Sequence, residues 1–194
     1  TDAAGITDAV DGAALVLGLA GKSVNCRYTP ENRAEIFASR LRTTRALRDA
    51  LASASDPAPV WINSSTATIY RHAVDHPQTE TAGELGHGFS VEVAKAWERE
   101  LYEGDLPGVR RVAMRSAIVL GESGGVLATL QNLARFGMGG TQLDGWWPVS
   151  QARRAAGTAH EIGARGGRQH FSWIHLDDVA RAIEHIERTP ELAG

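Results

Sequence analysis

A cluster of hydroxyl side chains directly after a short apolar run is the part of this sequence best suited to chemistry. The run at residues 60–62 leads through Asn63 into Ser64-Ser65-Thr66-Ala67-Thr68-Ile69-Tyr70. Unbroken apolar runs of this kind are typical of strands buried in a parallel sheet. Hydroxyls at the end of such a strand can bind the oxygen of an alcohol or ketone. The commoner role of Ser and Thr at a strand end is to bond the backbone of the following turn.

The elements that must position this cluster alternate between short apolar runs and amphipathic helices. Strands are predicted at residues 13–19, 60–62, 109–120 and 171–175, the third of them either continuous or broken at Arg115-Ser116. Helices are predicted at residues 30–52, 89–102 and 125–136, and a last one is expected to begin with Asp177 as its N-cap. Residues 70–88 and 137–167 read as irregular. This alternation predicts an α/β fold with a parallel sheet, whose ligands bind beyond the C-terminal strand ends.

Composition excludes several classes of function. The net charge of −3 and the pI of about 6.1 give no electrostatic case for nucleic acid or for an anionic membrane surface. A single cysteine, Cys26, rules out an intrachain disulfide and fits a reducing compartment, so we expect a cytoplasmic protein. No metal site is expected, because His72, Asp75 and His76 lie in a predicted loop with no further strong ligand nearby in the sequence. A small molecule is the expected partner, and a homo-oligomer is left open.

Four motifs, in order along the chain, resemble the extended short-chain dehydrogenase/reductase superfamily, in its NAD-dependent epimerase/dehydratase branch. They are Leu19-Ala20-Gly21, the segment Ser64 to Tyr70, Arg115-Ser116-Ala117-Ile118-Val119-Leu120-Gly121, and Trp173-Ile174-His175-Leu176-Asp177-Asp178-Val179-Ala180. The pairs Ser39-Arg40 and Trp97-Glu98 narrow the resemblance to an atypical epimerase-like subgroup. The resemblance implies a Rossmann-type doubly wound parallel sheet, present in part, with the start of a smaller substrate-side region.

The resemblance also implies a nicotinamide cofactor, NAD(P), with NADP favoured over NAD. The residues expected to bind it are Leu19, Ala20, Gly21, Ser64, Arg115, Ser116, Ala117 and Ile118. The family's Gly-x-x-Gly-x-x-Gly turn does not precede residue 13. We therefore expect a piece of a longer chain that binds the cofactor weakly by itself. Its expected parts are a partial NAD(P)-binding domain at 1–136, an irregular substrate-side insertion at 137–170, and a returning strand and helix at 171–194.

The same resemblance places Thr66 at the family's catalytic hydroxyl, with Ser65 beside it. The Tyr-x-x-x-Lys pair that normally completes the site is missing, since its positions hold Ser90 and Ala94, or Val91 and Lys95 in a register shifted by one.

Arg40 is a further catalytic candidate, because its guanidinium could bind an anionic group of the substrate, although a solvated basic helix face is the alternative. The substrate-side candidates are Trp146, Trp147, Trp173 and His175, and for His175 a plain strand-end contact is the alternative.

The expected function is an NAD(P)-dependent epimerase or oxidoreductase acting on a hydroxyl or keto group of a small polar substrate such as a nucleotide sugar. A catalytically inactive cofactor-binding regulatory or scaffold protein is the alternative. A third reading is an autonomous domain with a function of its own.

Overall fold

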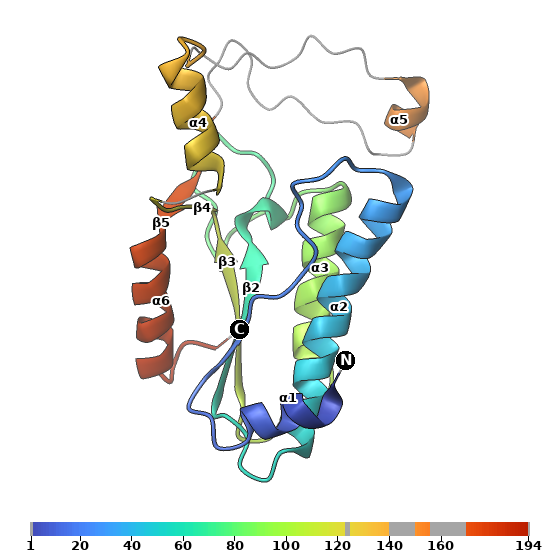
Figure 1. The fold of residues 1–194 in the computed structure, drawn as a ribbon, viewed down its shortest axis with the longest axis vertical. Coiled ribbons are helices and arrows are strands. Elements are labelled where there is room, and N and C mark those ends of the chain that lie inside the picture. The colour runs from blue at the N-terminus through green and yellow to red at the C-terminus, as the bar shows by residue number, and fades with distance from the viewer. Residues whose placement is uncertain (1, 123–124, 140–149, 156–169, 194) are drawn as a thin grey trace. The chain divides into compact units, whose positions relative to one another are not determined.

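The computed structural model describes residues 2–122, 125–139, 150–155 and 170–193. The helices are α1 (Ala3–Val10), α2 (Pro30–Ser53), α3 (Phe89–Tyr102), α4 (Gly125–Arg135), α5 (Gln151–Ala155) and α6 (Leu176–Arg188), with a short 3-10 turn at Ala67–Ile69 (Figure 1). The strands are β1 (Val16–Gly18), β2 (Val60–Thr66), β3 (Arg110–Ser116), β4 (Ile118–Leu120) and β5 (Trp173–His175). No helix in the described ranges is long and apolar enough to cross a membrane.

Contacts divide the chain into two compact units. The first comprises Thr1–Thr66, Val93–Ser116 and Arg181–Gly194, and the second comprises Ala67–Glu92 and Ala117–Ala180. The predicted division at residues 136 and 170 stays a prediction, because most of the insertion at 137–170 lies outside the described residues.

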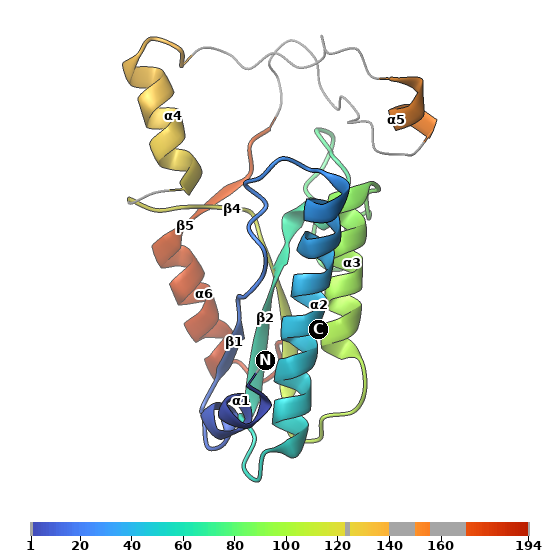
Figure 2. The same ribbon diagram turned by 45° about the vertical axis from the view of Figure 1, so that its right-hand side comes forward.

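A three-stranded parallel sheet in the order β1-β2-β3 forms the centre of the first unit. Side chains of β2 alternate between its two faces. Trp61 joins a core with Leu51 of α2 and Leu101 of α3, whereas Ile62 packs in a second core with Val112. Two residues of α6, Ile183 and Ile186, pack against this second core. Helices thus cover both faces of the sheet, which explains the unbroken apolar run and confirms the predicted α/β class (Figure 2).

The long helix α2 begins as the sequence indicates. The Thr29 side chain accepts a hydrogen bond from the Asn32 amide at 3.3 Å, and Pro30 occupies the first turn, where its missing N–H costs nothing. The helix α3 lies beside α2 over the same face of the sheet (Figure 1). These two helices therefore sit where they can support the strand ends.

Two details of the predicted elements are wrong. The apolar run at 109–120 forms two strands, β3 and β4, which separate at Ala117 rather than at Arg115-Ser116 and pair with different partners, β2 and β5. Asp177 is not the N-cap of the last helix, because α6 already begins at Leu176. Instead, the Nδ1 atom of His175 accepts a hydrogen bond from the Asp177 amide at 3.2 Å. His175 therefore caps this helix, and Asp177 lies in its first turn.

The packing of α2 on the sheet gives a stability prediction. Leu51→Ala should lower the free energy of unfolding by about 2–5 kcal/mol, because Leu51 is only 1% exposed and its removal leaves a cavity. The control Leu17→Ala changes a leucine of β1 that is 40% exposed, so this substitution should lower the free energy of unfolding by less than about 1 kcal/mol. Urea unfolding of both variants measures the difference, and equal losses would contradict this placement of the core.

Candidate functional site

The C-terminal ends of the three parallel strands meet at one edge of the first unit's sheet. Gly18, the last residue of β1, pairs with Asn63, while Thr66 at the end of β2 pairs with Ser116 at the end of β3. The cofactor candidates Leu19, Ala20, Gly21, Ser64, Arg115 and Ser116 and the catalytic candidates Ser65 and Thr66 all lie at or just beyond these strand ends. The structure therefore brings together residues that are far apart in the sequence.

Apart from Arg40, which lies on α2 in the first unit, the remaining candidates belong to the second unit or lie outside the described residues. Ile118 pairs with Trp173, and His175 ends β5. Ala117 links β3 to β4, while Trp146 and Trp147 fall in the stretch that the structure does not describe.

A buried carboxylate, Glu98 of α3, joins the ends of β2 and β3. Its Oε1 atom accepts a hydrogen bond from the Ser65 hydroxyl at 2.5 Å and another from Nε of Arg115 at 2.8 Å. Its Oε2 atom accepts a hydrogen bond from Nη2 of Arg115 at 2.7 Å. Ser65 is 4% exposed, and the Glu98 side chain 11%. The Ser65 hydroxyl donates its only hydrogen to Glu98, so it is not free to donate to a substrate in this arrangement. The catalytic role of Ser65 and the cofactor-binding role of Arg115 stay predictions. Thr66, which is partly exposed, is left as the candidate for contact with a substrate.

Opposing influences act on the pKa of Glu98. Burial is the largest single cause and raises it, because the charged form loses hydration. The hydrogen bonds from Arg115 and Ser65, together with the charge of Arg115, outweigh burial and hold the pKa below its usual value of 4.5. Glu98 is therefore a fixed carboxylate at neutral pH.

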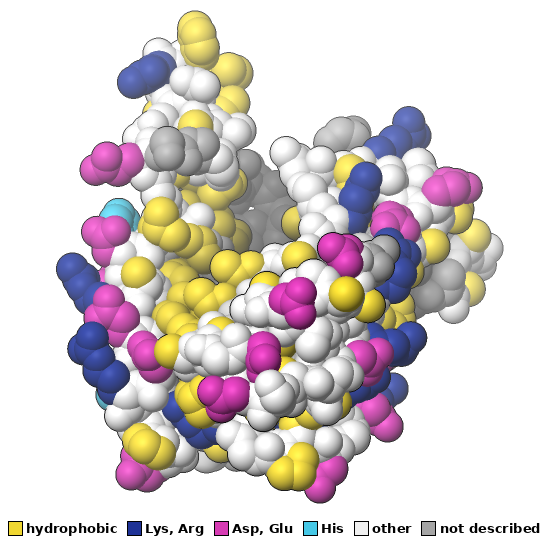
Figure 3. All heavy atoms as spheres, turned by 60° about the horizontal axis from the view of Figure 1, so that its bottom comes forward, with side chains coloured by type: hydrophobic (Ala, Val, Ile, Leu, Met, Phe, Trp, Pro, Cys, Tyr) yellow, Lys and Arg dark blue, Asp and Glu magenta, His cyan; other side chains and the backbone are white. Residues whose placement is uncertain are grey.

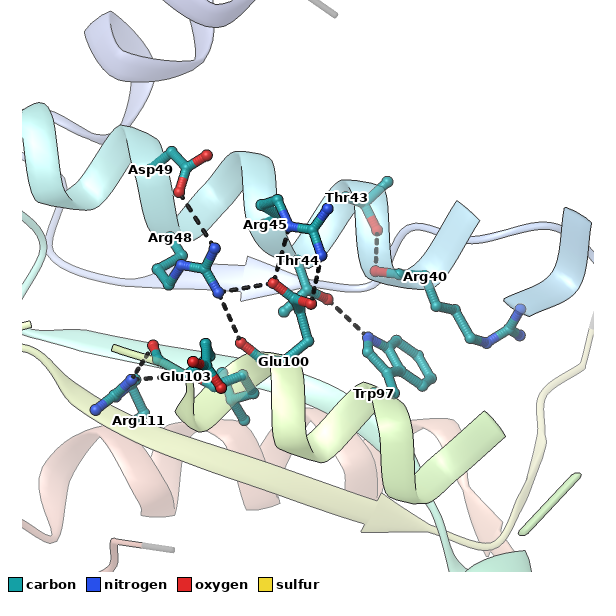
Figure 4. Close-up of polar contacts among 11 residues, drawn as sticks. Arg40, Thr43, Thr44, Arg45, Arg48, Asp49, Trp97, Glu100, Glu103 and Arg111 are labelled. Carbon is teal, nitrogen blue, oxygen red and sulfur yellow. Dashed lines mark hydrogen bonds and ion pairs between the residues drawn. The ribbon is translucent and has the colours of Figure 1, made fainter. Parts of the chain in front are cut away.

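Arg40 of α2 points at backbone rather than along a free basic face. Its Nη1 atom donates to the carbonyl oxygens of Ile36 at 3.0 Å and Lys22 at 3.1 Å. Its guanidinium carbon lies 5.0 Å from the centre of the Trp97 ring, and Trp97 Nε1 donates to the Thr44 hydroxyl at 2.8 Å (Figure 4). The catalytic role predicted for Arg40 from the sequence stays a prediction.

Nearby arginines of α2 are paired with acids, and two of them, Arg42 and Arg45, keep more than half of their side-chain surface exposed, so the alternative of a solvated basic face stays open. Arg45 and Arg48 both bind Glu100 of α3, with distances of 2.8 and 2.7 Å to its carboxylate oxygens (Figure 4). Arg42 pairs with Glu35 at 2.7 Å. Acidic and basic side chains of the described residues are also interspersed on the face drawn in Figure 3.

The positions that would carry the missing Tyr-x-x-x-Lys pair all lie on α3. Ala94 is 0% exposed and Val91 is 5% exposed, so both are buried, whereas Ser90 is exposed. A tyrosine on the same helix, Tyr102, accepts a hydrogen bond from the Ala113 amide at 3.0 Å, and burial raises the pKa of its phenol. A raised pKa disfavours the phenolate that a general base would need.

The fold and these strand-end groups define a Rossmann-type α/β protein. The chain matches no protein-family model. It is 30% identical over 180 residues to an epimerase family protein of Staphylococcus saprophyticus, a match that covers 93% of this chain and 53% of that protein. The chain thus spans about half the length of the curated relatives it matches.

Solved structures of low sequence identity share the fold. A human epimerase family protein, solved with NADPH, superposes with a TM-score of 0.71 at 24% identity, over 94% of this chain and 55% of that one. A nucleoside-diphosphate sugar epimerase of Corynebacterium glutamicum gives 0.70 at 24% identity, over 97% of this chain and 34% of that one. These matches bear out the predicted resemblance: the chain is similar in sequence to epimerase family proteins and shares the fold of solved epimerase-like structures.

The Glu98 contacts give a pH prediction. Glu98→Gln should lower the free energy of unfolding at pH 7 by about 3 kcal/mol, since it removes the carboxylate charge that pairs with Arg115 at 2.7 Å. The folded-state pKa lies below the unfolded value, so the wild-type contribution is complete above about pH 4.5 and is lost as the pH falls through the folded-state pKa.

The difference in free energy of unfolding between wild type and Glu98→Gln should therefore become smaller below about pH 4.5. Urea unfolding between pH 3.5 and 7 measures it, in steps of about half a pH unit. Glu103→Gln, at an exposed carboxylate just beyond the same helix, is the control and should change little. A gap of constant size across this range would show that the charge of Glu98 does not matter.

Proposed function

We propose that the protein is an NAD(P)-dependent epimerase or oxidoreductase that acts on a hydroxyl or keto group of a small polar substrate. A nucleotide sugar is the substrate class that we favour. The observation that carries the proposal is Thr66, whose strand ends opposite Ser116 at the edge where the Ala20-Gly21 segment also leaves the sheet. The names of the sequence relatives, and the NADPH and the sugar-nucleotide epimerase among the structural neighbours, support the same reading.

The strand-end residues fit a dinucleotide. Ala20 and Gly21 are exposed and small, so backbone is accessible to a flat ligand at this position. A Cβ on Gly21 would lie 3.2 Å from Cγ of Arg40, which is tighter than an ordinary contact. Glycine therefore allows the segment to lie against α2 while its other side stays open. We favour NADP over NAD, as the resemblance implies; the human neighbour was solved with NADPH and other neighbours of the same fold with NAD.

The chain's own contribution to the reaction is positioning and hydrogen bonding. The bound nicotinamide would supply or accept the hydride. Thr66 would hold the reacting oxygen of the substrate, and the Glu98–Arg115 pair would hold the two strand ends at a constant separation. The proton would come from a group other than the usual tyrosine.

A second candidate is a cofactor-binding regulatory or scaffold protein without turnover. It is favoured by one observation: neither register of the Tyr-x-x-x-Lys pair supplies a tyrosine, and the buried residues at these positions, Ala94 in one register and Val91 in the other, carry no ionisable group. The two candidates differ only in chemistry. Both predict cofactor binding.

Substitution of Thr66 separates the two candidates. In the full-length protein supplied with NADPH or NADH and a panel of sugar nucleotides and carbonyl compounds, Thr66→Val should lower kcat/KM by about 100-fold, because it removes one hydrogen bond to the reacting oxygen. Cofactor affinity should change by less than about twofold, since Thr66 acts on the substrate. Steady-state kinetics and a cofactor titration measure the two quantities.

Thr68→Val is the matched control, because Thr68 is exposed and lies beyond the strand end, and it should retain activity. Unchanged turnover in Thr66→Val would remove Thr66 from the mechanism. Cofactor binding by a wild-type protein that converts no member of the panel would favour the scaffold reading.

A further inference from the structure

The segment Ala20–Lys22, just beyond β1, is tied to one turn of α2 through its backbone. The Lys22 amide donates to Oγ of Ser39 at 2.9 Å, and Arg40 Nη1 donates to the Lys22 carbonyl oxygen at 3.1 Å. The Thr43 hydroxyl lies 3.2 Å from the Ala20 carbonyl oxygen, but it is also 3.0 Å from that of Ser39 and can donate only one hydrogen. Ser39 and Arg40 are therefore the main restraints on the segment.

Arg40 is itself held from three directions. It also donates to the Ile36 carbonyl oxygen on its own helix, and its guanidinium stacks on the Trp97 ring of α3. Trp97 is fixed in turn by its hydrogen bond to Thr44, which is 1% exposed. Because the guanidinium is planar, it can stack with one face and donate from its edge at the same time. A lysine could donate to the backbone but could not stack in this way.

The other side of the segment is open. Leu19, Ala20, Gly21 and Lys22 are all exposed, although the amide and carbonyl groups of Lys22 are bonded toward α2. A backbone that is fixed on one side and open on the other can bind a ligand without first losing conformational freedom. This is an arrangement for binding rather than for packing.

We propose that Arg40, together with Ser39, is a positioning residue that pre-orders Ala20 and Gly21 for contact with the adenosine half of the dinucleotide. This inference rests on the proposed cofactor binding, and the family resemblance implies the adenosine half as the part that meets Leu19-Ala20-Gly21. It gives Arg40 a role in cofactor affinity, in place of direct binding to an anionic substrate.

The test separates the two halves of the cofactor. In the full-length protein, Arg40→Met should raise the Kd for NADPH and for ADP-ribose by about 10-fold, which corresponds to the loss of one or two well-formed hydrogen bonds. The Kd for nicotinamide mononucleotide should stay within about twofold, because that half does not meet the segment. Calorimetric titrations measure all three, and Arg40→Lys should recover part of the affinity.

Hydrogen exchange of residues 19–23 in the free protein provides a second readout. Ser39→Ala and Arg40→Met should both speed exchange at the Lys22 amide, because one loses the acceptor and the other loosens the segment. Arg42→Met is the control, since Arg42 lies on the same helix but pairs with Glu35, and it should change neither readout. If Arg40→Met fails to fold, Ser39→Ala carries the comparison of ADP-ribose with nicotinamide mononucleotide.

Unchanged affinity for ADP-ribose in Arg40→Met, or an equal loss for both halves of the cofactor, would overturn the inference and leave the proposed function standing. A wild-type protein that binds neither NADPH nor NADH would overturn the proposed function. Hydrogen exchange would still report whether Arg40 orders the segment.

Discussion

A single buried carboxylate, Glu98, is the constraint on which the strand-end region depends. A charge taken out of water is costly, and it is tolerated only where opposite charge and hydrogen bonds compensate fully. Arg115 and Ser65 supply that compensation from two neighbouring strands, at 2.5–2.8 Å. Because all three groups must be in place together, α3 can sit at only one position along β2 and β3. At these strand ends, Thr66 and Ser116 face each other through the register of β2 and β3.

Side chains of α3 also contact α2. Trp97, next to Glu98 in the chain, bonds Thr44 and supports the guanidinium of Arg40, while Glu100 binds Arg45 and Arg48 (Figure 4). Contacts of this kind between side chains of two helices restrict sliding of one helix along the other. A contact network therefore runs from the β2–β3 strand ends through α3 and α2 to the segment after β1.

Much of the fold could be predicted because its signals are local. Thr29 and Pro30 mark the start of α2, and unbroken apolar runs mark strands covered on both faces. The site residues at strand ends follow from parallel topology. The contact of Glu98 could not be predicted in the same way, since an acid on an amphipathic helix reads as exposed until the register of that helix on the sheet is known. The break at Ala117 and the cap by His175 likewise depend on pairing and geometry distant from the local pattern.

Our central proposal is that these strand ends form a dinucleotide site in which the Thr66 hydroxyl hydrogen-bonds the reacting oxygen of the substrate. A crystal structure of the full-length protein with NADPH and a substrate analogue tests it most directly. The account predicts the adenosine ribose against Ala20 and Gly21 and the Thr66 hydroxyl within hydrogen-bond distance, about 3 Å, of the substrate oxygen. A dinucleotide bound away from these strand ends, or a Thr66 hydroxyl turned away from the substrate, would contradict it.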